Sequence, residues 1–513
     1  MQKKYTYQAF ASLMLAIGLP AYAGEQIDLG NDLKFDWRLN TSYSLAVRTK
    51  DRAPLLSVGT GESNGNNNFN KGALTANRVS GVFEGKLHKN GSGLVMTVST
   101  FYDDVYHRRN DNDAVRNKST GAPYNQFTSQ TKRYQGGYTR LLDTYAFTSF
   151  DVGSESRATL KVGRQVVNWG EAVYFANISA AQGPFDGAKN GIPGTEVKES
   201  VLPEDQISAS IEVTPKWSLL AQWQLGFQET ILPALGAFLS TENAMGPGSF
   251  CLGDVNASGV CTGVPRSGDK TPSKTSQWGV GTRYRVTPAT EVGVYYLNYN
   301  DRTPSLMIKP DYSSYYLEYF DNIKMLGATV STAVGSVSAY GELTYRKGTP
   351  VLVGEGNNVK TVRGNVTQLN VGGFYNVGRT AVADDMQVLA EVSAVRVNSI
   401  SGAYRFDDLT FKTRDSLAFS GTVALSYPGV AEGWELSVPL SYSYQIKGRS
   451  LVGTFGGGEG DHRYSIGATM VHKGNMSVNV TYLGYLGKAS LDAKNNRVMT
   501  DRDQLSVTLK YSF

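Results

Sequence analysis

Residues 33–47 read LKFDWRLNTSYSLAV and alternate between two kinds of side chain. One parity is apolar and aromatic, and consists of Leu33, Phe35, Trp37, Leu39, Tyr43, Leu45 and Val47. The other parity is polar, and consists of Lys34, Asp36, Arg38, Asn40, Ser42 and Ser44. Successive side chains of a β-strand point to opposite faces, so this strand has an apolar face and a polar face. Because strands of soluble proteins average about six residues, the length favours a tilted membrane strand.

The same alternation recurs along the chain, and short turn sequences rich in Gly, Pro, Asn and Ser alternate with long connections. That loop asymmetry is typical of outer-membrane barrels, which have tight periplasmic turns and long extracellular loops. We predict an all-β, transmembrane, antiparallel up-and-down β-barrel of about 18 strands (16–20), whose long extracellular loops partly plug the lumen. The predicted strands are 33–47, 76–88, 93–106, 140–151, 157–168, 205–213, 217–227, 275–286, 291–300, 324–333, 337–346, 365–376, 386–397, 416–427, 434–447, 462–471, 476–484 and 503–513.

Composition excludes several classes of protein. The chain has 513 residues, 19% of them charged, with a formal net charge of +5 and only two cysteines. Aromatic and β-branched residues are too plentiful for a disordered chain, and two cysteines are too few for a disulfide scaffold. The weak net charge and the lack of Lys/Arg runs argue against nucleic acid as a partner.

The two ends of the chain carry targeting signals. Residues 1–23 combine two lysines, a short apolar run and a small-x-small site, so we expect a secretory signal peptide and a single barrel domain over residues 24–513. No later apolar run is long enough for a spanning helix, and a closed barrel is the other structure that can cross a bilayer. Tyr511 and the terminal Phe513 resemble the signal that the barrel assembly machinery reads. We therefore expect the cell outer membrane, with its lipid and lipopolysaccharide, as the location.

Charged residues on the polar parity should face the lumen, because on the lipid face each would cost about 2–4 kcal/mol near the midplane. They are Lys34, Asp36, Arg38, Arg283, Arg285, Glu342, Arg346 and Glu391. Two interpretations stay open: ion-pair ladders that stiffen the wall, or groups that select the solute.

Two features lie in the long connection 228–274. Cys251 and Cys261 are expected to form a structural disulfide in an oxidising compartment; a metal or redox pair is the alternative. The residues Ile231, Leu232, Leu235, Phe238 and Leu239 are too apolar for free exposure. This apolar plug loop either enters the lumen mouth, where it would suit a hydrophobic passenger, or only packs on another loop.

Other candidate sites are weak. None of the four histidines lies three or four residues from another, so we expect no metal site and no cofactor. We find no Ser–His pair to nominate for hydrolysis, and we expect no enzyme.

A resemblance to a known family rests on several stretches in order. They are 163–171 (GRQVVNWGE), 202–203 (LP), 235–240 (LGAFLS), 299–304 (YNDRTP), 341–346 (GELTYR) and 350–351 (PV). With these the chain resembles the domain-of-unknown-function 1302 family of Gram-negative outer-membrane proteins. The resemblance implies no catalytic residues. It implies a periplasmic partner similar to lipoprotein-sorting proteins, and an RND-type inner-membrane transporter.

Residues 163–171 also allow an interpretation that does not depend on the family. They end a strand and open a long loop, so Arg164, Trp169 and Glu171 could latch that loop inside the barrel, with Arg164 and Glu171 as an ion pair; a binding site is the alternative. Taken with the resemblance, we expect a barrel component of a trans-envelope route for lipids or other hydrophobic molecules, with a lumen gated by loops. A diffusion porin for small polar solutes is the alternative, and a structural or adhesion barrel is a second one.

Overall fold

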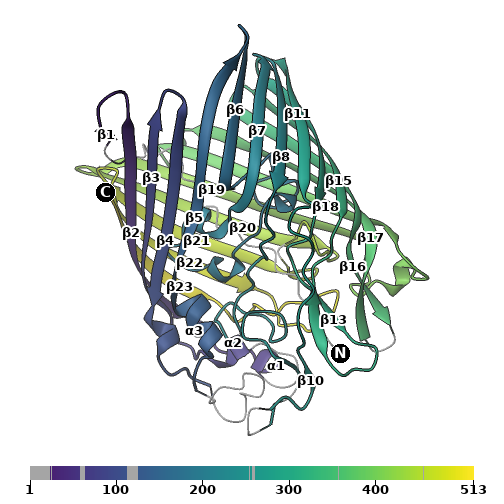
Figure 1. Cartoon of the computed structure of the whole chain (residues 1–513). Helices are drawn as coiled ribbons and strands as arrows, with labels where there is room; N and C mark the ends of the chain where they lie inside the picture. The colour runs from purple at the N-terminus through teal and green to yellow at the C-terminus, as the bar shows by residue number, and fades with distance from the viewer. Residues whose placement is uncertain are drawn as a thin grey trace.

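The structure is a computed structural model that describes residues 24, 26–57, 64–112, 125–253, 255–256, 260–355, 358–454 and 456–513. The predicted signal peptide at 1–23 lies outside the described residues. One antiparallel sheet of 19 strands dominates the described chain (Figure 1).

Eighteen of these strands form a closed barrel, because the first, β2, pairs with the last, β23, as well as with β3. The predicted strand number is confirmed. The barrel strands are β2 (Lys34–Arg48), β3 (Leu74–Lys89), β4 (Ser92–Asp103), β5 (Gly137–Val152), β6 (Ser156–Gln165), β7 (Glu204–Thr214), β8 (Trp217–Gln224), β11 (Trp278–Thr287), β12 (Thr290–Tyr299), β15 (Ile323–Val334), β16 (Val337–Glu355), β17 (Asn358–Gly378), β18 (Asp385–Ile400), β19 (Asp415–Ala431), β20 (Trp434–Lys447), β21 (His462–His472), β22 (Met476–Leu486) and β23 (Gln504–Ser512). The short β1 (Gln26–Asp28) pairs with the first residues of β2, Lys34–Asp36, at the end of the barrel with the short turns.

The outer surface of the barrel is apolar. Exposed large side chains follow the predicted outward parity, as at Tyr43 and Leu45 on β2, while their neighbours Ser44 and Ala46 are buried. Trp223, which is 49% exposed, points outward in the same way. A closed barrel with a greasy exterior and a polar interior is the architecture of outer-membrane proteins, and the protein is therefore an outer-membrane barrel.

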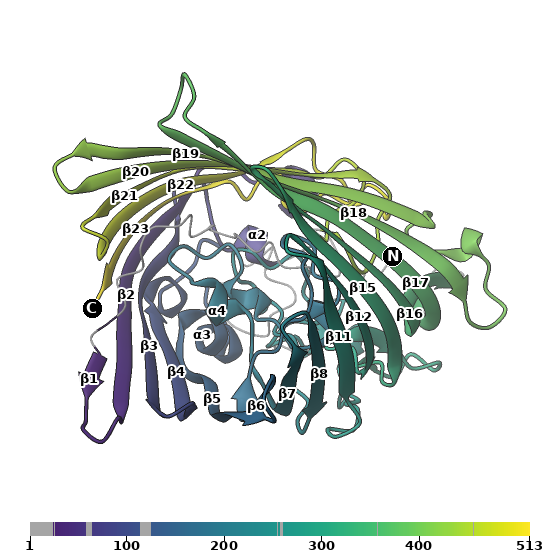
Figure 2. The ribbon, with the colours of Figure 1, turned by 90° about the horizontal axis from the view of Figure 1, so that it is seen from above.

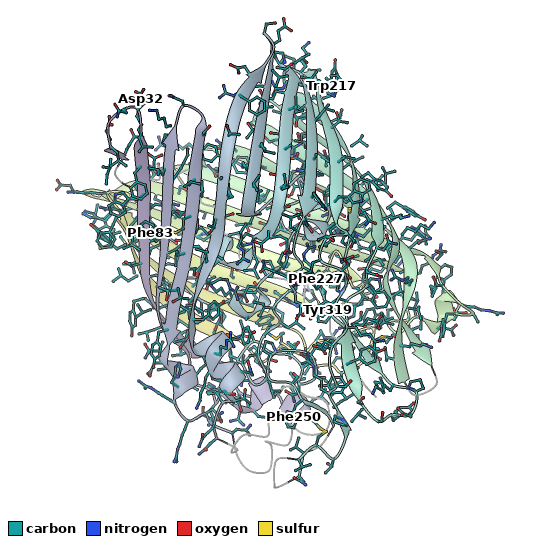
Figure 3. The ribbon with its side chains drawn as sticks, viewed as in Figure 1. Asp32, Phe83, Trp217, Phe227, Phe250 and Tyr319 are labelled. Carbon is teal, nitrogen blue, oxygen red and sulfur yellow. A yellow bond between two sulfur atoms is a disulfide. The ribbon has the colours of Figure 1, made fainter. Side chains whose placement is uncertain are left out.

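The two ends of the barrel differ. At one end the strands are joined by short turns, and Asp32 and Trp217 mark it in Figure 3. At the other end, where Phe250 lies, are the long connections. They carry α1 (Pro54–Ser57), α2 (Asn64–Asn67), α3 (Ser129–Gly136), α4 (Val197–Ser200) and the small hairpins β9 (Cys251–Leu252)–β10 (Val264–Pro265) and β13 (Ser305–Ile308)–β14 (Tyr315–Glu318). Short 3₁₀ turns are η1 (Asp104–His107), η2 (Ser179–Ala181), η3 (Gly187–Lys189) and η4 (Phe406–Asp408). None of the helices in the described chain is long and apolar enough to cross a membrane.

One connection differs from the prediction. Residues 347–364 were expected as a loop, but β16 and β17 continue through most of it as a paired hairpin. The register shifts between Lys347 and Thr349, where Gly348 has a φ of 85°. This bulge breaks the alternation, which is why parity alone ends the strand too early.

Several long connections turn back into the barrel rather than outward. Viewed from above, α3 and α4 lie within the ring of strands (Figure 2). The core of the molecule is therefore built between the inner wall and the inserted loops, and includes Trp169, Ile178, Leu297 and Met325.

Candidate functional site: a partition across the lumen

Residues 166–203, between β6 and β7, cross the barrel interior, and two wall glutamates hold the part from Glu171 to Ile178. The first is Glu342 on β16, whose carboxylate accepts hydrogen bonds from the backbone N–H groups of Glu171 (2.7 Å), Ala172 (3.1 Å) and Ile178 (2.6 Å). Glu342 is fully buried. Its charge is thus solvated by the backbone of the loop instead of by water.

The second is Glu391 on β18. It accepts hydrogen bonds from the backbone N–H groups of Val173 (2.7 Å), Tyr174 (2.8 Å) and Phe175 (3.2 Å). The side chains of Tyr340 (2.7 Å) and Asn370 (2.9 Å) also donate to it. A hydrogen bond to a charged group contributes about 1.5–3 kcal/mol, so the two carboxylates fix this segment firmly. We call residues 171–178 the partition.

Further wall side chains fix the far end of the partition. Arg346 donates to the Oδ1 of Asn177 at 2.7 Å, and Thr344 donates to the same atom at 2.5 Å. At the near end, a Cβ on Gly170 would lie 2.7 Å from Glu342 Oε2, so glycine permits the close approach to that carboxylate.

Two cavities lie on either side of the partition. The larger, of about 970 Å³, opens among the long connections. The smaller, of about 480 Å³, reaches Pro288 and Ala289 in a short turn at the other end of the barrel. Glu171 and Val173 line both cavities. The partition is therefore the wall between an outer and an inner vestibule.

The larger cavity is mixed in character. Its apolar lining includes Phe175, Leu232, Leu239, Leu352, Leu483 and Met499. Its charged lining includes Lys198, Asp301, Arg302, Arg346, Asp461 and Arg463. Burial raises the pKa of Asp301 to about 6, against the opposing effects of the Thr303 N–H and Arg346. The cavity thus suits a small molecule with both apolar and polar parts.

The partition itself carries one acidic side chain, Glu171. Burial raises the pKa of Glu171, Arg283 opposes that shift, and Glu291 and Glu342 add to it. Arg283 in turn donates to the carbonyl of Trp169 at 3.0 Å. Charges of both signs thus meet at the narrow point between the cavities.

Ion pairs dock the rest of the crossing segment on the wall. Glu196 binds Lys510 of β23 at 2.6 Å, and Lys198 binds Glu84 of β3 at 2.7 Å. Glu84 also pairs with Arg38 of β2 at 2.5 Å. Deeper in the segment, Lys189 and Glu199 form a buried pair at 3.0 Å.

The predicted lumen-facing residues lie on the inner wall, but they make different contacts. Arg283, Arg346, Glu342 and Glu391 contact the inserted segment, as described above. Arg38 pairs with Glu84, which in turn binds Lys198 of that segment. Asp36 binds His88 at 3.0 Å, and its neighbour of the same parity, Lys34, pairs in register with His88. Arg285 lines the inner cavity.

The ion pair predicted for the latch residues Arg164 and Glu171 is wrong. Arg164 does not pair with Glu171; it pairs with Asp205 of β7 at 3.0 Å, because the two stand opposite each other in the strand register. Trp169 is buried and stacks on Tyr295, with ring centroids 5.8 Å apart. The latch is thus made by Glu342 and Glu391 on the wall. Parity predicted that both side chains face inward, but their partners in the partition are backbone N–H groups, which no pattern of residue types reveals.

The apolar plug loop lies inside the molecule. Leu232, Leu235 and Phe238 are nearly fully buried, and Leu239 lines the larger cavity beside Gly191. Ile231 bonds through its N–H to the carbonyl of Phe185 in the crossing segment at 2.9 Å. This loop therefore packs on another loop, and Leu239 also forms part of the cavity wall. Its role toward a hydrophobic passenger stays a prediction.

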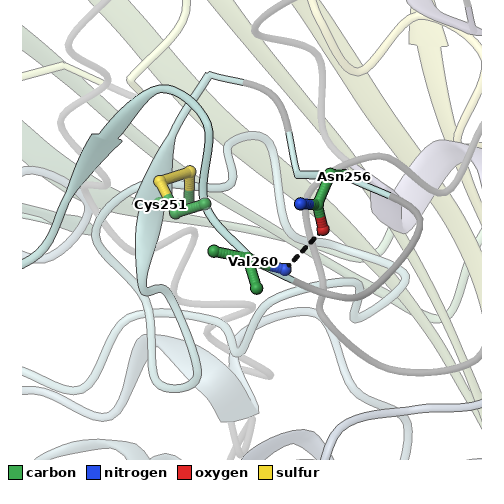
Figure 4. Close-up of a disulfide and its surroundings, with 4 residues drawn as sticks. Cys251, Asn256 and Val260 are labelled. Carbon is green, nitrogen blue, oxygen red and sulfur yellow. Dashed lines mark hydrogen bonds between the residues drawn. A yellow bond between two sulfur atoms is a disulfide. The ribbon is translucent and has the colours of Figure 1, made fainter.

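The remaining predicted residues lie away from the partition. Cys251 and Cys261 are joined as a disulfide, and Asn256 accepts the N–H of Val260 within the closed loop at 2.9 Å (Figure 4). Tyr511 and Phe513 are exposed at the end of β23, with ring centroids 4.6 Å apart. Within the described residues, no group of three or more His, Cys, Asp or Glu side chains is placed to hold a metal ion.

Comparisons with known proteins give a family and distant structural neighbours. No curated protein matches the chain. Similar solved structures include Acinetobacter baumannii OccAB4, with 9% identity and a TM-score of 0.44 over 96% of this chain and 100% of that one. Another is Pseudomonas aeruginosa OccK8 (OprE), with 10% identity and a TM-score of 0.43 over 94% and 98%. The sequence profile described as "Protein of unknown function (DUF1302)" matches residues 6–513, and the chain belongs to this family.

Proposed function

We propose that this protein is a channel that lets small solutes cross the outer membrane, with the partition as its constriction. The observation that carries the proposal is the pair of cavities that open toward opposite ends of the barrel and share Glu171 and Val173. A solute that displaces or passes the partition would have a continuous route. The size of the larger cavity, about 970 Å³, falls within the range of about 300–1,000 Å³ for small-molecule sites.

This choice reverses the order of the two functions expected from the sequence. A route for lipids or other hydrophobic molecules stays as the second candidate, because Leu232, Leu239, Leu483 and Met499 give the larger cavity an apolar side. It would require the periplasmic lipoprotein-sorting-like partner and the RND-type transporter that the family resemblance implies. The small-solute channel requires neither partner and uses the charged side of the cavity as well.

Liposome swelling tests the first proposal. Proteoliposomes with the intact protein should swell slowly in small sugars or amino acids, and faster when Glu342→Gln and Glu391→Gln loosen the partition. Empty liposomes and Glu432→Gln, a change in a short turn, serve as controls. If neither the intact nor the loosened protein admits any small solute, the channel proposal is wrong. Hydrophobic molecules that co-purify with such an impermeable protein would favour the second candidate.

A further inference from the structure

The outer wall carries a pair of lysines that stand side by side at the end with the long connections. Lys324 is the second residue of β15, and Lys347 lies directly opposite it on β16. Both side chains are exposed. Their strand neighbours Met325 and Arg346 are fully buried on the inner face, so both lysines point outward, away from the lumen.

The two lysines lie where the apolar belt of the barrel ends. The next outward pair toward the membrane is Leu326, 55% exposed, opposite Tyr345, 43% exposed. Beyond these come Ala328 and Leu343. An exposed tyrosine beside aliphatic residues is typical of the membrane interface, where headgroups begin. The lysines therefore sit at headgroup level in the outer leaflet.

This pairing costs free energy in the isolated protein. Like charges that face each other across two strands are destabilising. The nearby acidic side chain, Asp321, is engaged by Arg363 at 2.6 Å. Neither lysine takes part in an ion pair among the residues that the structure describes. Asn298 and Asn365 stand opposite the pair on the flanking strands β12 and β17, so the row carries no negative charge.

We propose that Lys324 and Lys347 form a binding site for a phosphate group of the glycolipid in the outer leaflet. A phosphate between the two ammonium groups would turn their repulsion into two charge-assisted contacts. The acyl chains of the same lipid would lie along Leu326, Tyr345 and Leu343. A lipid with a phosphate above several acyl chains matches this vertical order of charge and apolar surface. The site faces away from the lumen and is independent of solute passage.

Native mass spectrometry of the full chain tests the proposal. The probe is lipid A with both phosphates, compared with dephosphorylated lipid A, and with inorganic phosphate alone. The intact protein should retain lipid A and prefer the phosphorylated form. The double variant Lys324→Ser, Lys347→Ser should retain it about tenfold less well, a change of about 1.4 kcal/mol. The matched control, Lys89→Ser with Lys216→Ser, removes two exposed lysines from the short turns and should bind normally.

Melting temperature gives a second, independent readout. In detergent without phosphate, the double variant should be as stable as the intact protein or more stable, because a repulsion is gone. With lipid A added, the intact protein should gain more than the variant. Equal retention by the two proteins, or equal gains with dephosphorylated lipid, would overturn the proposal. If inorganic phosphate alone matches the effect of lipid A, the site binds free anion and the lipid assignment is wrong.

Discussion

Two glutamates determine how the lumen is divided. Glu342 and Glu391 together accept six backbone hydrogen bonds from the partition. Loss of either carboxylate would leave three N–H groups without their acceptor. The N–H groups of Phe175 and Ile178 are buried, and for a buried group that loss costs about 1–3 kcal/mol. Side-chain parity along β16 and β18 was enough to predict that both glutamates face inward. It could not predict their role, because nothing in the spacing of residues says which connection folds into the barrel.

A residue-scale prediction concerns the charge on the partition. We expect the carboxylate of Glu171, which lines both cavities, to bias ion passage toward cations. Glu171→Gln should therefore weaken this preference for cations. Because burial raises the pKa of Glu171, the intact protein should lose the same preference as pH falls, and at a higher pH than an ordinary glutamate would require. Reversal potentials in a KCl gradient measure this. A cation preference that is unchanged in the variant would exclude Glu171 as the selective group.

A second prediction at this scale concerns Asp301, whose pKa is raised to about 6. A folded-state pKa above the unfolded value means that the ionised form destabilises the fold, so this penalty is present above pH 6 and vanishes as pH falls below the unfolded value. Asp301→Asn should therefore raise the melting temperature at pH 7.5 and leave it unchanged at pH 3. A lower melting temperature at pH 7.5 would show that the carboxylate stabilises the fold.

At the scale of elements, alternation was a reliable guide wherever a strand keeps its register. Strand β2 was predicted at 33–47 and spans Lys34–Arg48. The extension of β16 was missed because the bulge at Gly348 shifts the parity, so Pro350 and Val351 no longer continue the earlier pattern. Arg164 was assigned a partner in its own segment, but strand register pairs it with Asp205. Cross-strand partners depend on register, which a single strand does not reveal.

An element-scale prediction tests how closely the crossing segment packs against the wall, with neither glutamate substituted. Gly170→Ala would place a methyl group 2.7 Å from Glu342 Oε2, so the segment must move away from the wall. We expect higher conductance and faster protease cleavage within residues 166–203. Gly268→Ala is the matched control, since a Cβ there meets nothing within 4 Å. Identical conductance of the two variants would mean that contact with Glu342 does not position the segment.

At the scale of the whole molecule, the barrel is a closed wall whose interior is filled by its own long connections. The number of strands and their apolar outward faces could be predicted from the sequence. Every strand that crosses a bilayer must turn apolar side chains to the lipid and can turn polar ones to the lumen. The arrangement of the inserted segments could not be predicted from the sequence. These segments are held by scattered ion pairs such as Glu196–Lys510, whose members are 314 residues apart in the chain. The two vestibules are thus a property of the assembled fold alone.

The central claim is that a displaceable partition, held by Glu342 and Glu391, closes an otherwise continuous lumen. Single-channel recording in planar bilayers tests it most directly, with the intact protein compared with the variant Glu342→Gln, Glu391→Gln. We predict small, brief openings for the intact protein and a larger, longer-lived conductance for the variant. A large steady conductance in the intact protein, or no difference between the two, would contradict the claim.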